Sequence, residues 1–90
     1  MSAIAPALSY WNQAGGSAQI GPVGPRSLYA IISTVTGGAV TIYDNTSAAG
    51  TILCTKTLAV GDVIHFGGLG IRAKNGLFIS VTGTVNVIYS

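Results

Sequence analysis

The stretch from Leu28 to Asp44 most constrains the fold, because it has the composition and spacing of two β-strands joined by a turn. Residues 28–35 are rich in Ile, Val, Thr and Tyr, which suit a pleated and half-buried surface. Gly37-Gly38 can take the positive φ that a two-residue hairpin turn needs. In residues 39–43 the side chains alternate between the two faces that a strand has. The stretch therefore predicts a β-hairpin.

The residues after position 45 repeat these short strand-like runs and turn signals. Gly, Asn and Asp recur about every 8 to 12 residues, and Asn75-Gly76 is a strong signal for a hairpin turn. No apolar repeat with the period of a helix is visible. The strand-like runs cover residues 51–58, 63–66, 69–73, 77–82 and 84–89. We therefore predict an all-β fold, an antiparallel β-sandwich or jelly-roll-like barrel of about seven or eight short strands.

Residues 1–25 differ from the rest of the chain, since Ala, Ser, Gly, Pro and Gln dominate them. Pro22 and Pro25 would interrupt a β-ladder, and the segment carries too little apolar surface to fold alone. We therefore predict an extended N-terminal arm over residues 1–25, with one short strand near residues 17–20. A β-sandwich domain follows over residues 26–90.

The chain is poor in charge, which limits the surface that it can present to water. It has four Lys and Arg and two acidic residues, so that charged residues make up 7% of the chain against about 25% in typical soluble domains. Hydrophobic residues make up 49%. Because a free monomer normally keeps charge on its surface, we interpret this neutral surface as one that other subunits bury. The alternative is a small secreted β-domain coated with Thr and Ser.

The same composition argues against nucleic acid and membranes as partners. The net charge is only +2 and just Arg72 and Lys74 lie close together, whereas nucleic-acid binding needs clustered Lys and Arg. No stretch approaches the roughly 18 apolar residues that span a membrane, and we expect no signal peptide. Cys54 is the only cysteine, so we predict a small buried apolar residue there rather than a disulfide.

The sequence offers few groups for catalysis. It has one histidine, His65, and two carboxylates, Asp44 and Asp62, whereas general acid–base chemistry usually needs a His or paired carboxylates held close together. Both Asp residues have the context of turns, and His65 is predicted to be a packed or interface residue. The glycine-rich residues 67–70 lack the Gly-Lys-Ser/Thr ending of a phosphate loop. We therefore predict no enzyme, no catalytic residue, no cofactor and no metal site.

The residues with the strongest case for binding a partner lie in the arm. Trp11 is the only tryptophan, and its large ring favours an apolar contact over water. With Tyr10 it is predicted to anchor the arm on a neighbouring subunit, together with the apolar side chains of Ile20 and Val23. Two alternatives are that Trp11 packs on its own domain and that the arm is disordered.

The order LYAIIS…TGGAVTIYDNTSAAGT, followed by FGGLGIRAKNGLFISVTGTVNVIYS, resembles small β-proteins found among the structural genes of tailed bacteriophages. The match covers about residues 24–89 and rests on turn and strand residues. The chain departs from the family pattern at residues 71–74, where an aromatic residue before Asn75-Gly76 is more usual, and in its 25-residue arm. The residues that carry the resemblance are Leu28-Tyr29, Tyr43-Asp44-Asn45-Thr46, Asn75-Gly76-Leu77 and the ending from Thr84 to Tyr89.

This resemblance implies a virion component that is assembled in the host cytoplasm. The favoured function is a capsid decoration (cement) protein that binds the major capsid protein, or another virion protein, as a homo-oligomer, with a trimer favoured. The resemblance supplies no catalytic residue. The alternative is a tail or head-fibre accessory domain that recognises a receptor or carbohydrate, for which Tyr10, Trp11 and Tyr43 are the candidate stacking aromatics.

Overall fold

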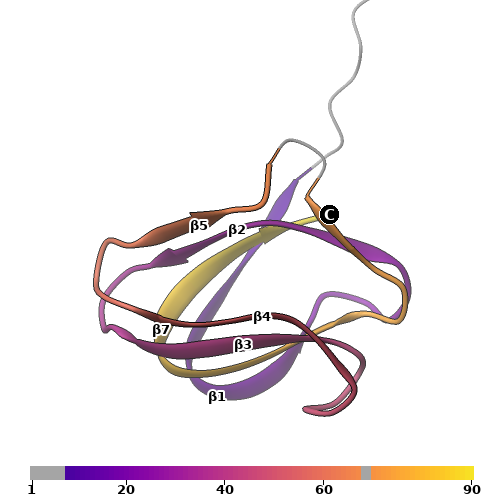
Figure 1. Ribbon diagram of the computed structural model, residues 1–90, viewed down its shortest axis with the longest axis horizontal. Coiled ribbons are helices and arrows are strands. Elements are labelled where there is room, and N and C mark those ends of the chain that lie inside the picture. The colour runs from indigo at the N-terminus through magenta and orange to yellow at the C-terminus, as the bar shows by residue number, and fades with distance from the viewer. Residues whose placement is uncertain (1–7, 68–69) are drawn as a thin grey trace, which may run out of the picture.

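The computed structural model describes residues 8–67 and 70–90, and it confirms the predicted all-β, antiparallel fold (Figure 1). Its seven strands belong to one strongly curled sheet, and no helix occurs in these two ranges. Among the described residues there is accordingly no helix of a length and hydropathy that could cross a membrane. The strands are β1 (Ser9–Ile20), β2 (Arg26–Ser33), β3 (Gly38–Asp44), β4 (Thr51–Leu58), β5 (Val63–His65), β6 (Ile71–Ala73) and β7 (Leu77–Tyr89).

The longest strand, β7, is the centre of the sheet. Along one edge it pairs with β1 from Ser9 opposite Tyr89 to Ile20 opposite Leu77. Its other edge is shared, because β3 pairs with residues 77–81 and β2 pairs with residues 85–89. Beyond these, β4 extends the sheet from β3, while β5 and β6 both pair with β2. Every long strand therefore depends on β7 directly or through one neighbour.

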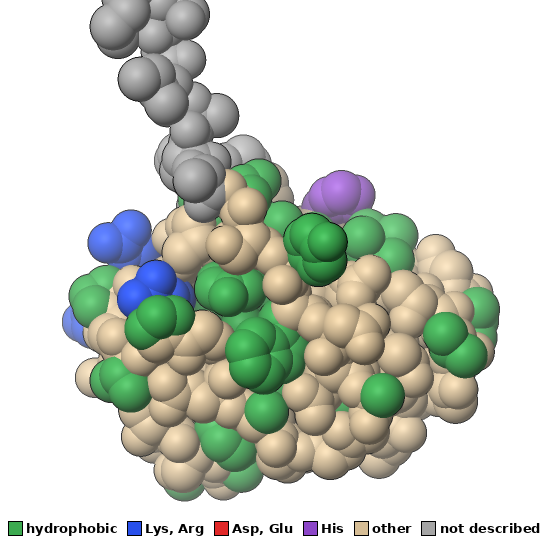
Figure 2. Space-filling view, turned by 180° about the vertical axis from the view of Figure 1, so that it is seen from behind, with side chains coloured by type: hydrophobic (Ala, Val, Ile, Leu, Met, Phe, Trp, Pro, Cys, Tyr) green, Lys and Arg blue, Asp and Glu red, His purple; other side chains and the backbone are tan. Residues whose placement is uncertain are grey.

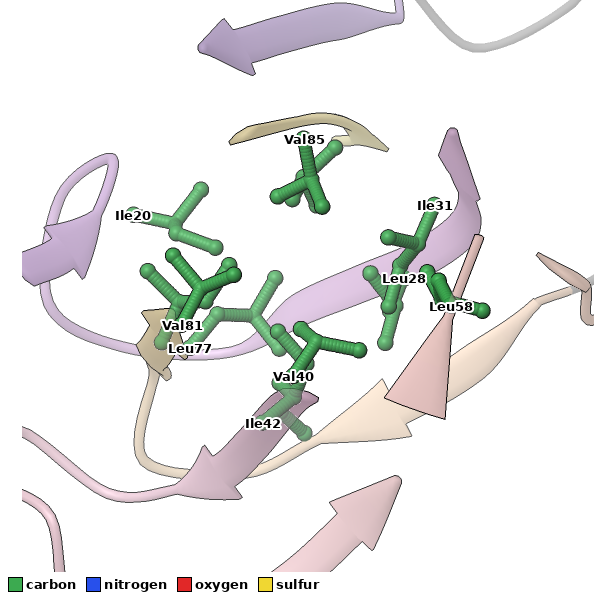
Figure 3. Close-up of a cluster of buried hydrophobic side chains, with 12 residues drawn as sticks. Ile20, Leu28, Ile31, Val40, Ile42, Leu58, Leu77, Val81 and Val85 are labelled. Atoms are coloured by element: carbon green, nitrogen blue, oxygen red, sulfur yellow. The ribbon is translucent and has the colours of Figure 1, made fainter. Parts of the chain in front are cut away.

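The core lies between the two halves of the curled sheet. In β7 the side chains alternate as the sequence predicts, with every second residue directed inward and buried. Figure 3 shows the inward side chains of the two halves converging on one cluster. The buried apolar residues of this cluster are Ile20, Leu28, Ile31, Val40, Ile42, Leu58, Ala73, Leu77, Ile79, Val81, Val85 and Val87.

The predicted hairpin at Gly37-Gly38 is wrong, because β2 and β3 do not pair with each other. Both run antiparallel to β7 on the same edge, so that β3 follows β2 along β7. Neither glycine has a positive φ. The absence of a side chain allows the backbone of Gly38 to approach that of Gly83, since a Cβ atom on Gly38 would lie 2.7 Å from the backbone nitrogen of Gly83. The two glycines therefore mark a bend in one long path rather than a reversal of the chain.

This bend coincides with irregularities in the two neighbouring strands. β1 has a register shift between Ala14 and Gly16, opposite the middle of β7, and Gly15 and Gly16 have φ values of 68° and 74°. In β7, Gly83 occupies an inward position where a Cβ atom would overlap the carbonyl oxygen of Thr36. A bulge increases local twist and bends a strand. β1, β7 and the path from β2 to β3 therefore all have an irregularity at the same level, and there the sheet folds over its own core.

The Asn75-Gly76 hairpin prediction is also wrong. β6 pairs only with β2, and β7 pairs with β1, β2 and β3, so this segment connects two strands that are not partners. Asn75 lacks the positive φ that a type I′ turn requires. Its amide donates to Asp44 Oδ1 over 2.8 Å, and its carbonyl accepts the Gly24 amide over 3.0 Å. Asn75 therefore bonds to Asp44 and Gly24, which lie elsewhere in the chain, and not across a hairpin.

The prediction of a separate arm needs correction from Ser9 onward. Residues 9–20 are extended as expected, but they form the twelve-residue strand β1, which includes the short strand predicted near residues 17–20. Pairing with β7 and burial of Ile20 supply the apolar contact that this segment lacks by itself. Residues 21–25, which contain Pro22 and Pro25, connect β1 to β2 without forming a strand. The part of the arm before residue 8 lies outside the described residues.

We expect Gly83→Ala to destabilise the fold by about 3 kcal/mol, because the added methyl group meets the backbone of Thr36 and Gly37 rather than a movable side chain. Ser80→Ala on the same strand is the control. The side chain of Ser80 is on the outer face, and its loss is expected to change stability by less than about 0.5 kcal/mol. Urea unfolding of both variants measures the difference. Equal midpoints for Gly83→Ala and the unchanged protein would contradict the close contact.

Candidate interaction surface

The outer face formed by β1, β7, β2 and β5 carries few charges. Residues that lie opposite one another across strands share a face, so one row crosses these four strands from Tyr10 through Ile88 and Ala30 to His65. The next row runs from Asn12 through Asn86 and Ile32 to Val63. Within this row, Asn12 Nδ2 donates to Asn86 Oδ1 over 2.8 Å. The face therefore combines apolar side chains with neutral amides.

The opposite outer face, formed by β1, β7, β3 and β4, is lined with hydroxyl groups. One row consists of Ser17, Ser80, Thr41 and Thr55. The hydroxyls of Thr41 and Thr55 are 3.2 Å apart and share a hydrogen bond. Both broad faces are thus largely neutral, and Figure 2 shows apolar side chains spread among uncharged polar ones on one side of the molecule.

Most of the charge gathers at one end of the molecule. Arg26 on β2 pairs with Ala73 on β6, and Ala73 is flanked in the chain by Arg72 and Lys74. The Lys and Arg side chains visible in Figure 2 lie together at one side. Asp44 lies beside them, since its carboxylate accepts the amides of Lys74 and Asn75 over 2.8–3.1 Å. We call Arg26, Asp44, Arg72 and Lys74 the charged end. The sequence places Arg72 near Lys74, but Arg26 joins them only through the pairing of β2 with β6.

At the other end of β2, three exposed valines form what we call the apolar tip: Val35, Val60 and Val63. Their exposed fractions are 78%, 58% and 45%. The loops that carry Val35 and Val60 are adjacent, because Ser33 donates its amide to Asp62 O over 2.8 Å and accepts the Gly61 amide over 2.9 Å. None of these three valines was among the predicted partner-binding residues. The available signal was a large apolar residue inside each of two turn segments, where polar residues are usual.

The four predicted partner-binding residues do not form one surface. Tyr10 is 72% exposed and Val23 is 63% exposed, so both are accessible to a partner. Ile20 was expected on a partner-facing surface, but its side chain is fully buried, because it is directed inward opposite Leu77. Trp11 is half-buried and packs against the core of its own domain, which is one of the two alternatives that the sequence left open.

A short chain of hydrogen bonds holds Trp11 in that position. Its indole Nε1 donates to Gln13 Oε1 over 2.9 Å, and Gln13 Nε2 donates to the Gly15 carbonyl over 2.7 Å. The side chains therefore satisfy polar groups beside the bulge of β1. Trp11 and Tyr10 are directed to opposite faces of β1, and Tyr43 lies opposite Phe78 near the other end of β7. The three candidate aromatics thus do not form a common stacking platform.

The groups considered for chemistry serve structural roles or lie apart. Asp62 Oδ2 accepts the Ala59 amide over 2.9 Å and closes a turn, as predicted. Cys54 is half-buried against the core, and burial raises the pKa of its thiol while the Lys56 charge acts in the opposite direction. His65 is exposed on β5. Within residues 8–67 and 70–90, no three His, Cys, Asp or Glu residues come together, and no pocket is enclosed.

Comparisons of the chain with models of protein families, with curated proteins and with solved structures found no match.

The contact between Asp44 and residues 74–75 predicts a pH-dependent stability. The Asn75 amide, aided by that of Lys74, lowers the pKa of Asp44 below its ordinary value of 3.8, although partial burial opposes this effect. The stabilisation is therefore present above the unfolded-state pKa and is lost as the pH falls through the lower folded-state pKa. We expect Asp44→Asn to lower stability by about 1 kcal/mol at pH 7, with the difference lost once the pH is below the folded-state pKa of Asp44. Urea unfolding across this pH range measures it, and a difference that does not change with pH would contradict the assignment.

Neighbouring aromatic residues on β1 should behave differently when they are truncated. We expect Trp11→Ala to lower stability by about 2 kcal/mol, because it removes a ring packed on the core. Tyr10→Ala should change stability by less than about 0.5 kcal/mol, since its side chain is mostly in water. Thermal unfolding followed by circular dichroism gives both values. Equal losses in the two variants would show that Trp11 does not pack on its own domain.

Proposed function

We propose that this protein is a non-enzymatic structural component of a bacteriophage particle, most specifically a capsid decoration protein that binds the shell as a small oligomer. The observation that supports this proposal best is the neutral surface, on which large apolar side chains remain exposed. Seven of them exceed two fifths exposure: Leu8, Tyr10, Val23, Val35, Ile52, Val60 and Val63. The sequence resemblance gives the proposed partner, the major capsid protein.

The apolar tip is the part of the surface best suited to contact the shell. Exposed apolar side chains that gather in one place mark interfaces in soluble proteins. Val35, Val60 and Val63 project from adjacent backbone segments, and the charged end lies at the opposite end of β2. Contact through the tip buries apolar surface, while the side chains of Arg26, Arg72 and Lys74 remain hydrated. The tip therefore offers a favourable hydrophobic gain without desolvating these three cations, and the exposed charge nearest to it is Asp62, which lies between Val60 and Val63 in the chain.

Co-sedimentation of the purified protein with phage capsids that lack it tests this proposal. We expect the unchanged protein to sediment with the shells and the double variant Val35→Ser/Val60→Ser to bind at least about tenfold more weakly, since two exposed apolar contacts are lost. The matched control is Tyr10→Ser/Val23→Ser, which removes two equally exposed apolar side chains elsewhere.

The two double variants also locate the contact. A loss confined to Tyr10→Ser/Val23→Ser would place the shell contact at the residues that the sequence indicates and not at the apolar tip. If the unchanged protein remains in the supernatant at every shell concentration, the capsid function is wrong.

A further inference from the structure

The outer edge of β1 has no partner strand. β1 pairs with β7 along one edge, and its opposite edge faces away from the sheet among the described residues. In a strand, alternate residues direct their backbone N–H and C=O groups to opposite edges. Half of the backbone groups of β1 are therefore available for pairing with another chain.

β1 has only one of the features that usually protect such an edge, a bulge at Gly15. Proteins block exposed edge strands by making them short or by placing Lys, other charges or proline in them. The other unpaired edges follow this rule, because β5 and β6 have three residues each and β4 carries Lys56. β1 has twelve residues and contains neither a charged residue nor a proline. Its bulge at Gly15 leaves residues 9–14 as a regular segment of six residues.

We propose that β1 binds the β1 strand of a second copy of this protein in antiparallel register, which joins two sheets across a two-fold axis. A two-fold contact places each residue near residues of the same strand. Any charge in β1 would be present in both paired strands, and the absence of charge from the whole strand removes the repulsion that would arise near the two-fold axis. β4 is a poorer candidate, because each strand of such a pair would carry the charge of Lys56.

The side chains of β1 fit this contact. Tyr10 lies on the outer face with 72% of its surface exposed, so that strand pairing would cover part of its ring. Ser9, Asn12 and Ala14 are also exposed and neutral. Pairing of this kind joins copies two at a time, which differs from the trimer that the sequence resemblance implies. It requires no capsid and is independent of the proposed function.

Sedimentation equilibrium of the full chain without shells tests the two-fold contact. We expect a monomer–dimer equilibrium whose dissociation constant rises at least about tenfold in Ser9→Lys/Ala14→Lys, because the two copies bring four lysines into one strand pair. Thr51→Lys/Thr57→Lys is the control, since it adds two lysines at exposed positions of the other long edge. The control should dimerise like the unchanged protein.

Three results would overturn the proposal: a monomer at all concentrations, a trimer, or a dimer that only the β4 variant disrupts. Circular dichroism establishes that each variant is folded. Hydrogen exchange of the unchanged protein gives a readout that needs no variant. Amides in residues 9–14 should exchange more slowly above the dissociation constant than below it, and exchange independent of concentration would contradict pairing through β1.

Discussion

The structure depends on the backbone contact between Gly83 in β7 and the connection formed by Thr36 and Gly37. At this point the chain leaves one half of the sheet and enters the other without losing its hydrogen bonds to β7. Thr34 donates its amide to the Thr84 carbonyl over 3.0 Å, and Thr84 donates its amide to the Thr36 carbonyl over 2.8 Å. Because Gly83 has no side chain, the two backbones can approach closely enough for the sheet to fold over. The shared core follows from this fold, since it unites inward residues of both halves.

Strand composition was the part of the fold that the sequence predicted well. Residues 77–82 and 84–89 were correctly predicted to be extended, because the composition and period of a strand are local properties, although Gly83 continues the chain between them and the two runs form the single strand β7. Strand partners were predicted less well. Gly37-Gly38 and Asn75-Gly76 match the sequences of hairpin turns. Glycine, however, allows close backbone contact as well as positive φ, so the sequence does not show which of the two is needed. Only the long-range pairing with β7 decides which of these uses applies.

The candidate surface shows the same division between local and long-range information. Scarcity of charge is a property of composition, so a neutral surface could be expected from the sequence. The gathering of Arg26 with Arg72 and Lys74 could not, because it requires the register of β2 with β6. Trp11 and Ile20 appeared available for a partner while residues 1–25 were considered alone. Once β1 pairs with β7, alternation directs Ile20 into the core and places Trp11 against it.

The order of the strands along the chain has a consequence for how the protein folds during synthesis. β7 is made after the other six strands of the sheet, yet β1, β2 and β3 all pair with it. While residues 77–89 are still inside the ribosome, only the β3–β4, β2–β5 and β2–β6 pairs can form, and isolated pairs of strands are marginally stable in water. Until β7 is available, the apolar residues of the earlier strands therefore remain uncovered, and contacts between such distant residues also make folding slow. A chain with so few charges has little repulsion to keep its copies apart during that interval.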